Sequence, residues 1–487
     1  MFSRFTRRIS VFPVVLIGFL IAGLSFSAAP ACGASSARKG TAEEAWPPPP
    51  PPNAPITMKD TIYGVLRTHR ELKGMQENRQ VLEHELTRAR AGFGPSVDIT
   101  GEAGGNLLSD STTRRENLDK EMYGIGQISG RATLPLFDGF ANRSRVRSAK
   151  STLQSVKHRV FDTATTLSLD GIIAHIDVLR SREIYALSER NVAQHRAILN
   201  MTQDRSSLGA DTEADVSQAQ SRLQRALSSL AEAQANLLIA EDTYRRLTNM
   251  LATPKLEPVN MPPQEFKGPN EVFELAEKFN PKLAAYLQDV RVLIGDKELA
   301  ESAFYPTINA EVGPTYTDRG GSYDRWVYNF DAVATMRWNV FNSGADVAER
   351  KAALARIRQA RQTMYNFVDD LKLDIESTWS NYLSAQDQYK HYMEAIRHNE
   401  FTRTAFLEQF QMGMRSLLDV LDAENELYSS STQAATARGN ILVGAYTLCA
   451  LTGDLLPVLS IDTKPLAQNP AHDPQKKEEE FDVGWFN

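Results

Sequence analysis

The sequence predicts an α+β membrane protein made of two copies of one unit, each with a long α-helical hairpin and a pair of β-strands. Three observations support this: an internal repeat, two uninterrupted helical patterns of roughly 70 residues, and four short stretches that alternate with a period of two. Of the 487 residues, 42% are hydrophobic, 23% are charged and only 8% are aromatic. This composition favours long helices over a compact globular core.

The repeat is clearest at two glycine motifs that each precede a heptad pattern. Gly413 to Glu424 reads Gly-Met-Arg-Ser-Leu-Leu-Asp-Val-Leu-Asp-Ala-Glu, and its counterpart begins at Gly209. Alanine-rich seams follow both motifs, and small residues at heptad positions allow a partner helix to approach closely. We therefore expect Gly209 and Gly413 to form the turns of two helical hairpins.

The duplication also includes the strands that precede the long helices. Leu136-Phe-Asp-Gly139 corresponds to Val340-Phe-Asn-Ser-Gly344, so that about 160 residues recur in the same order. Gly139 and Gly344 are expected at the strand–helix junctions, because a sharp bend there needs dihedral angles that glycine adopts most easily.

The N-terminus has the layout of a secretory signal peptide, predicted over residues 1–31. A proline-rich linker, 32–56, with six consecutive prolines at 47–52, follows it. Cys32 fits either a poor lipoprotein box or ordinary cleavage just before it, and we favour ordinary cleavage. The second of the two cysteines is Cys449, so no disulfide framework is expected.

The remaining chain divides into a first repeat at 57–253, a connector at 254–270, a second repeat at 271–455 and a polar tail at 456–487. Helices are predicted at 57–91, 139–207 and 213–250 in the first repeat and, in the second repeat, at 271–303 and from Gly344 through Gly413 to residue 451. The lengths suggest that each long helix runs out from the strands and that two short helices return beside it, end to end. In the second repeat only one short helix follows Gly413, so the first helix of the chain, 57–91, would take the place of the other short helix, end to end with it.

The strands are predicted near 97–103, 122–136, 307–316 and 325–338, each with one apolar and one polar face. The last carries Trp326, Tyr328 and Trp338 on its apolar face, and the two tryptophans would lie roughly 30 Å apart, which suits the two aromatic girdles of a membrane strand. The alternative is a strand of a soluble sandwich. Four strands cannot close a barrel and an open edge is not tolerated in lipid, so the chain is expected to oligomerise.

Other functional classes find little support. The net charge of −6 argues against a nucleic-acid partner. The glycine-rich stretch Gly124–Gly130 lacks the third glycine of a dinucleotide loop and precedes a strand. No histidine pair has metal-binding spacing on a helix, and no nucleophile motif occurs. We expect no catalytic residue, no metal site and no cofactor, and the protein is not expected to be an enzyme.

The duplicated hairpins, the strand-end motifs at Gly139 and Gly344 and the Gly413 turn resemble the TolC-like outer-membrane channel family over residues 57–455. The resemblance implies an outer-membrane homotrimer in contact with lipid, with a shared twelve-stranded transmembrane β-barrel and a periplasmic α-helical tunnel. It also implies a periplasmic adaptor (membrane fusion) protein and an inner-membrane ABC or RND-type pump as partners.

Two segments, Thr68–Leu72 and Ala89–Val97, resemble the channels of adhesin-type secretion systems. The predicted function is therefore the exit duct of a type I protein secretion system. The exit duct of a tripartite drug or metal efflux pump is the alternative. A more distant alternative is a trimeric periplasmic coiled-coil scaffold with soluble strands.

The resemblance also implies a periplasmic gate. Asp419 and Asp422 match acidic ring positions, Arg415 and Asp215 match a charged pair between hairpins, and Phe410 replaces a family tyrosine and so lacks its hydroxyl. The residues alone leave simpler interpretations open. Asp215 and Asp419 both fit helix-capping boxes, and Arg415 could pair with Asp419 on its own helix. Asp422 has no such local explanation.

Overall fold

The computed structural model describes most of both predicted repeats. The described residues are 46–51, 54–107, 109, 114–115, 122–252, 255–319 and 326–466. The predicted signal peptide, Cys32 and the tail beyond residue 466 lie outside them. Among the described residues, no helix contains an apolar stretch long enough to span a membrane.

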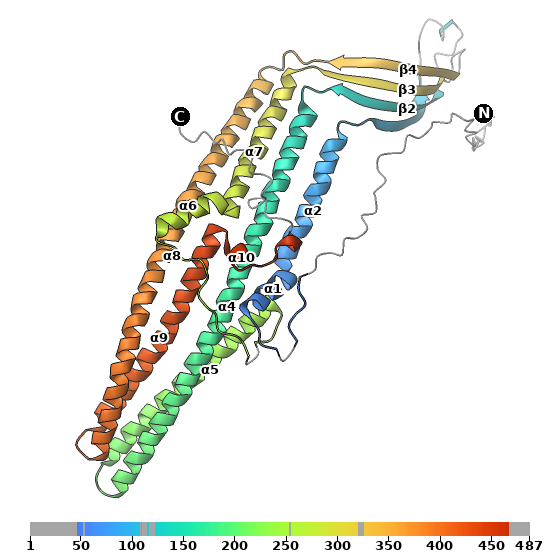
Figure 1. Cartoon of the computed structure of the whole chain (residues 1–487). Helices are drawn as coiled ribbons and strands as arrows, with labels where there is room; N and C mark the ends of the chain where they lie inside the picture. The colour runs from blue at the N-terminus through green and yellow to red at the C-terminus, as the bar shows by residue number, and fades with distance from the viewer. Residues whose placement is uncertain are drawn as a thin grey trace, which may run out of the picture. The chain divides into compact units, whose positions relative to one another are not determined.

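Two long helical hairpins form most of the structure (Figure 1). In the first, α4 (Ala141–Ser207) packs on α5 (Glu213–Thr248), and in the second, α8 (Ala345–Gln411) packs on α9 (Leu417–Thr452). The long helices have 67 residues each and the returning helices 36 each. Equal lengths in both halves agree with the duplication seen in the sequence.

The helices that lie beside α4 on the strand side contain a break that was not predicted. The predicted helix 271–303 is two helices, α6 (Pro269–Phe279) and α7 (Pro281–Glu301). Proline has no backbone N–H and its ring clashes with a preceding turn, so Pro281 begins a helix rather than continuing one. The side chain of Asn280 caps α7 by accepting a hydrogen bond from the Leu283 N–H at 3.0 Å.

The predicted helix 57–91 is also interrupted, at His69, which has an extended backbone. The first part, α1 (Met58–Thr68), buries Ile62 and Val65 in the central core, whereas α2 (Arg70–Ala91) is mostly exposed and packs along α4. The two parts have different packing partners, and neither proline nor glycine marks the break. The expectation that this helix completes the column beside α8 is wrong within one chain, because α2 lies against α4 and α7 lies between α4 and α8.

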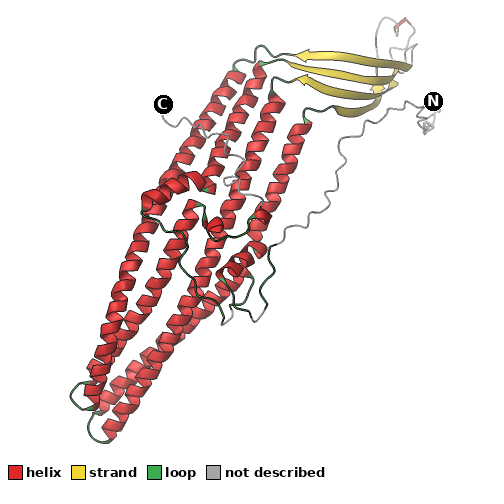
Figure 2. Cartoon of the chain, in the orientation of Figure 1, coloured by secondary structure: helices red, strands yellow, loops and turns green. Residues whose placement is uncertain are grey.

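Four strands form one antiparallel sheet in the order β1 (Ser96–Asn106), β2 (Tyr123–Phe137), β3 (Thr307–Arg319) and β4 (Trp326–Arg337). Each strand is joined through a short connection to one of the helices α2, α4, α7 and α8 (Figure 2). Within the described residues, the outer edges of β1 and β4 have no strand partner.

The strand register separates polar from apolar side chains. One row across all four strands consists of Thr100, Ser129, Thr315 and Asn329. The adjacent row contains Ile128, Tyr316 and Tyr328, whose side chains lie on the opposite face because strand side chains alternate. The sheet therefore has one hydroxyl- and charge-rich face and one apolar, aromatic face.

The central core joins both hairpins with α1, the connector and the C-terminal helix α10 (Leu455–Val458). A hydrogen-bonded chain centred on three buried side chains crosses it. The Thr61 hydroxyl lies 2.9 Å from both His175 Nδ1 and the Tyr244 hydroxyl, and His175 Nε2 lies 2.9 Å from the Glu257 carbonyl oxygen. A neutral imidazole satisfies every contact when Nε2–H donates to Glu257 and Nδ1 accepts from Thr61.

We expect this chain to make the fold sensitive to acid. Burial lowers the pKa of His175 below its usual value, and the nearby Arg182 charge acts in the same direction. The unfolded chain then binds more protons than the folded one, so stability is complete above the ordinary histidine pKa of about 6.5 and falls as the pH drops below it. Thermal unfolding in detergent at pH 8 and pH 5 should show a lower Tm at pH 5.

His175→Gln should reduce this pH difference and lower the stability at pH 8 by about 1–3 kcal/mol, because buried hydrogen-bonding groups lose their partners. His391→Gln, at an exposed position on α8, is the control and should behave like the parent. If the difference in Tm between pH 8 and pH 5 is the same in His175→Gln as in the parent, His175 is not the source of the acid sensitivity.

Candidate functional site

The two hairpin tips have the same backbone geometry. Gly209 has a φ of 76° and Gly413 a φ of 73°, in the left-handed region that other residues avoid. At each tip the next N–H reaches back across the turn: Ala210 N–H donates to the Arg205 carbonyl and Met414 N–H to the Gln409 carbonyl, both at 2.9 Å. These bonds satisfy carbonyls at the ends of α4 and α8.

Thr212 and Ser416 cap the helices that follow the tips, with Asp215 and Asp419 at the third helical position. Asp215 N–H donates to Thr212 Oγ1 at 3.2 Å, and Thr212 N–H donates to the Asp215 carboxylate at 3.0 Å. These bonds to Thr212 lower the pKa of Asp215. At the second tip, Asp419 N–H donates to Ser416 Oγ at 3.3 Å. Within one chain, both aspartates occupy the capping positions that the sequence left open as an alternative.

The expected pair between Arg415 and Asp215 is not formed in the described residues of one chain. Arg415 Nε instead lies 3.5 Å from Asp419 Oδ2, four residues along the same helix turn, and its guanidinium lies 3.9 Å from the Phe406 ring centroid. Asp215 is engaged by Thr212. Short-range partners on the same hairpin have thus taken the place of the contact between hairpins.

Asp422 has a partner on the other hairpin, which no local pattern in the sequence indicated. Its carboxylate accepts a hydrogen bond from Arg222 Nη2 at 3.0 Å, which joins α9 to α5. The Asp422 side chain remains 58% exposed. A half-exposed ion pair of this kind is weak, so the carboxylate stays available to ions in solution.

Phe410 lies in a different environment from the other gate residues. It is 2% exposed, in an apolar cluster that contains residues of all four tip helices. The Arg205 guanidinium lies 4.6 Å from its ring centroid, and Arg205 Nη1 donates to the Phe410 carbonyl at 2.9 Å. Asp211 holds Arg205 in place from the tip turn, with Nε to Oδ2 at 2.8 Å.

Arg205 therefore joins the two hairpins at their tips, and sequence reasoning missed it. The arginine of α4 interacts with the carbonyl end of α8, where the helix dipole favours a cation. Arg205 on Phe410 and Arg222 with Asp422 are thus two separate polar contacts between the hairpins. We name these four residues the tip clamp. Local spacing carries no signal for it, since its partners lie on different hairpins.

The strand–helix junctions lie at the opposite ends of the long helices. Gly139 (φ 65°) lies between β2 and α4, and Gly344 (φ 82°) immediately precedes α8. The two sites differ in their surroundings. A Cβ on Gly139 would lie 2.6 Å from the Ser302 carbonyl oxygen, whereas a Cβ on Gly344 would meet nothing within 4 Å.

The aromatic residues singled out in the sequence are exposed on the sheet and beside it. Trp326 and Tyr328 of β4 are 56% and 66% exposed, and the Trp326 ring stacks on Tyr316 with centroids 5.3 Å apart. Trp338 lies just after β4, which ends at Arg337, and not inside the strand as predicted. Its indole N–H donates to the Phe304 carbonyl at 3.2 Å, which orients it at the junction.

Comparison with known proteins agrees with this architecture. A family model described as outer membrane efflux protein matches residues 61–250 and 272–454. The outer membrane efflux protein BepC of Brucella suis is 22% identical over 401 residues, covering 81% of this chain and 86% of BepC. The outer membrane protein TolC of Escherichia coli is 24% identical over 434 residues, covering 82% and 84%.

Among solved structures, the CmeC outer membrane channel of Campylobacter jejuni has a similar fold, with a TM-score of 0.72 at 13% identity, covering 82% of this chain and 86% of CmeC. The predicted resemblance is thus confirmed, and the relatives imply an outer-membrane location. The chain belongs to the outer membrane efflux protein family and is a TolC-like channel protein of the outer membrane.

Proposed function

We propose that three copies of this chain assemble into a channel-tunnel that serves as the exit duct of a type I protein secretion system. In the proposed assembly, the strands of the three chains form one twelve-stranded transmembrane barrel and the hairpins form a tunnel in the periplasm. A periplasmic adaptor and an inner-membrane ABC-type pump would meet the hairpin tips. The observation that carries the proposal is the two-faced, four-stranded sheet with two unpaired edges.

Such a sheet is unfavourable on its own in lipid. Unpaired N–H and C=O groups along β1 and β4 cost several kcal/mol each when no water is present, so the edges need a partner. Pairing β4 of one chain with β1 of the next would satisfy them. It would also turn the aromatic face of Trp326 and Phe330 outward and leave the row of Thr100 and Asn329 facing the lumen.

The helices support association as well. Leu373 and Phe401 of α8 are 64% and 77% exposed in one chain, although both are large and apolar. The part of α8 nearest the strands packs on α7. The side of α8 that faces away from α7 is open within the described chain. In a closed tunnel a neighbouring chain would cover that side. The α2 helix of that neighbouring chain would then lie beside α8, end to end with α9, a place that α2 does not take within its own chain.

Two observations bear on the cargo. The motif Thr68–Leu72, which resembles adhesin-type secretion channels, lies at the break between α1 and α2 and supports type I secretion. The second candidate, the exit duct of a tripartite efflux pump, is supported by the similarity to BepC, an outer membrane efflux protein. The two functions differ in what accumulates when the channel is missing.

Deletion of the coding sequence, with and without complementation by the wild-type chain, separates the candidates. The proposal expects a protein to disappear from the medium while sensitivity to dyes, detergents and solvents changes little. Unchanged secretion together with a marked rise in drug or solvent sensitivity would favour the efflux pump. The same strain complemented with the parent chain must recover the lost property.

Asp419 and Asp422 are proposed to form acidic rings at the periplasmic end, where symmetry would bring three copies of each around one axis. We expect Asp422→Ala to reduce cation selectivity in planar-bilayer recordings and to weaken block by divalent cations, because one ring of carboxylates is lost. The Arg222 side chain would also lose its partner and add positive charge near the axis.

Glu213→Ala provides a control, since this carboxylate lies at the start of α5 and outside the proposed rings. Its channels should keep the parent's selectivity. Asp422→Ala channels with unchanged selectivity and unchanged divalent block would remove Asp422 from the gate.

In the proposed trimer, the pair between Arg415 and Asp215 forms between hairpins of neighbouring chains rather than within one.

A further inference from the structure

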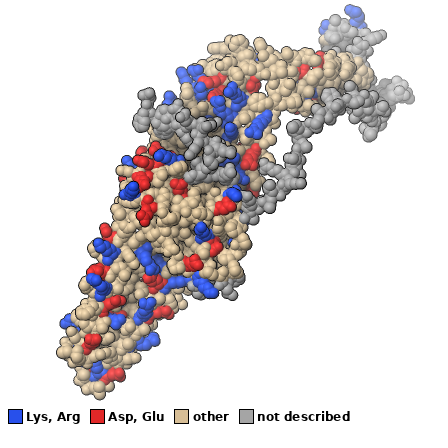
Figure 3. Space-filling view, in the orientation of Figure 1, with Lys and Arg blue, Asp and Glu red and all other residues tan. Residues whose placement is uncertain are grey.

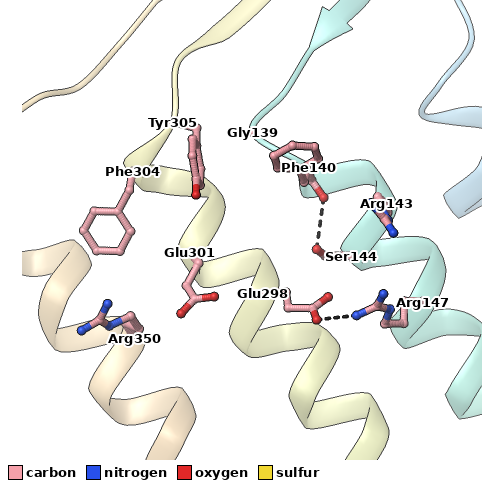
Figure 4. A pocket seen from close by; sticks show the side chains of 10 residues that line it. All are labelled: Gly139, Phe140, Arg143, Ser144, Arg147, Glu298, Glu301, Phe304, Tyr305 and Arg350. Atoms are coloured by element: carbon pink, nitrogen blue, oxygen red, sulfur yellow. Dashed lines mark hydrogen bonds and ion pairs between the residues drawn. The ribbon is translucent and has the colours of Figure 1, made fainter.

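A pocket of about 570 Å³ lies where the helices meet the sheet, and no part of the proposed transport path uses it. It is lined by residues of α4, the end of α7 and the start of α8 (Figure 4). Three arginines contribute to it: Arg143, Arg147 and Arg350. Its volume is within the usual range for small-ligand sites.

The pocket has surplus positive charge. Glu298 pairs with Arg147, and Glu301 accepts an ion pair from Lys297 at 2.7 Å. Both carboxylates in the lining are thus neutralised by a neighbour. Among the described residues, Arg143 and Arg350 have no carboxylate within ion-pair distance, and Arg350 contacts only the Phe304 ring, at 5.9 Å from its centroid. Lys and Arg side chains gather on this visible face just below the sheet (Figure 3).

Aromatic rings form the side of the pocket nearest the strands. Phe140 is 51% exposed and packs edge-on against Tyr305, with centroids 5.9 Å apart. Its backbone has a φ of 69°, a left-handed conformation that costs a bulky residue about 1 kcal/mol or more. Phe140 also packs edge-on against Phe137, with centroids 5.3 Å apart. These two ring contacts offset the backbone cost and hold an exposed aromatic side chain beside the pocket.

The pocket lies at the boundary between membrane and periplasm in the proposed assembly. Phe140 follows the end of β2 by three residues, and Tyr305 precedes β3 by two. Trp338, whose indole N–H is bonded to Phe304 of the pocket lining, is 52% exposed, as expected for an interfacial tryptophan. Figure 4 shows α8, α7 and α4 in the same left-to-right order as Figure 1.

We propose that this pocket binds the phosphate of an anionic phospholipid from the periplasmic leaflet of the outer membrane. Arg143 on α4 would contact the phosphate oxygens, and Arg350 on α8, across α7, would attract the anionic head group at longer range (Figure 4). Phe140 and Tyr305 would pack against the glycerol and the first acyl carbons. Three such sites would circle the channel below the barrel. The inference rests on the proposed placement of the strands in the membrane.

Native mass spectrometry of the full chain, purified in detergent and titrated with phosphatidylglycerol or phosphatidylcholine, tests the site. The parent should retain phosphatidylglycerol in preference to phosphatidylcholine. Arg143→Gln/Arg350→Gln should weaken phosphatidylglycerol retention by between about fivefold and about 30-fold, since each basic side chain near an anionic surface contributes roughly fivefold. Arg145→Gln/Arg358→Gln removes the same charge from the same two helices outside the pocket and should retain the lipid.

A second variant separates binding from folding. Phe140→Gly adopts the left-handed backbone without strain, so it should keep the parent's oligomer mass and yet retain less phosphatidylglycerol. Equal retention by the parent, the double arginine variant and Phe140→Gly would overturn the site. Full displacement of the lipid by an equal concentration of inorganic phosphate would show a phosphate site and not a lipid site, and would also overturn it.

Planar-bilayer recordings of the same samples distinguish a failure of the lipid site from a failure of the proposed channel function. Parent-like conductance with unchanged lipid retention overturns the lipid site alone. A parent protein that never conducts overturns the proposed channel, while its lipid preference is still scored in detergent.

Discussion

Arg205→Ala should open the periplasmic end of the channel more than any other single change at the tips. The guanidinium donates to the Phe410 carbonyl at 2.9 Å, stacks on the Phe410 ring and pairs with Asp211, so that its loss removes one of the polar links between the two hairpins. A hydrogen bond to a charged group contributes about 1.5–3 kcal/mol. Losing it should shift the closed-to-open equilibrium roughly tenfold or more toward open.

Single-channel conductance in planar bilayers measures this shift. Arg205→Ala should produce larger or longer openings than the parent, and Arg205→Lys should lie between them because it keeps the charge but not the planar fork. Arg196→Ala, at an exposed position on the same helix, is the control and should conduct like the parent. Conductance in Arg205→Ala equal to that in Arg196→Ala would show that the tip clamp does not hold the channel closed.

Gly139→Ala should destabilise the protein strongly, whereas the equivalent change Gly344→Ala should be mild. Both glycines have positive φ, which costs an alanine about 1–2 kcal/mol. Only Gly139 is also crowded, since its new Cβ would lie 2.6 Å from the Ser302 carbonyl oxygen and 2.9 Å from Tyr305 Cβ. Overpacking adds about 1–3 kcal/mol, so the total for Gly139→Ala is about 2–5 kcal/mol.

The amount of folded protein in outer-membrane fractions, together with its melting temperature in detergent, gives the comparison. Gly139→Ala should show lower yield and a lower Tm than Gly344→Ala. Equal effects in the two variants would mean that the close contact with α7 relaxes without cost, and that backbone conformation alone sets the requirement at both junctions.

Local patterns in the sequence were sufficient for much of the fold. The heptads after Gly209 and Gly413 predict the hairpins, and the alternation around Tyr328 predicts a two-faced strand, because both signals depend on residues close in the chain. Pro281 is also a local signal for the break between α6 and α7, although one helix was predicted over 271–303. His69 did not, since its break follows from the different packing partners of α1 and α2.

The candidate site was predicted less well. The caps at Asp215 and Asp419 were correctly foreseen as an alternative, because capping boxes are local. The contacts of Arg205 with Phe410 and of Arg222 with Asp422 join residues about 200 positions apart, and no spacing rule connects them. Only the packing of one hairpin on the other brings these side chains together.

The central claim is that β1 of one chain pairs with β4 of the next in a closed ring of three. Cysteines placed at Thr100 and Asn329, with Cys32 and Cys449 replaced by alanine, can be joined in membranes by a short bismaleimide. The account predicts a ladder of one, two and three linked chains that stops at three, and single-cysteine variants that stay unlinked because equivalent positions lie four strands apart in the ring. A ladder that continues beyond three chains, or an absence of linked chains in intact membranes, would contradict it.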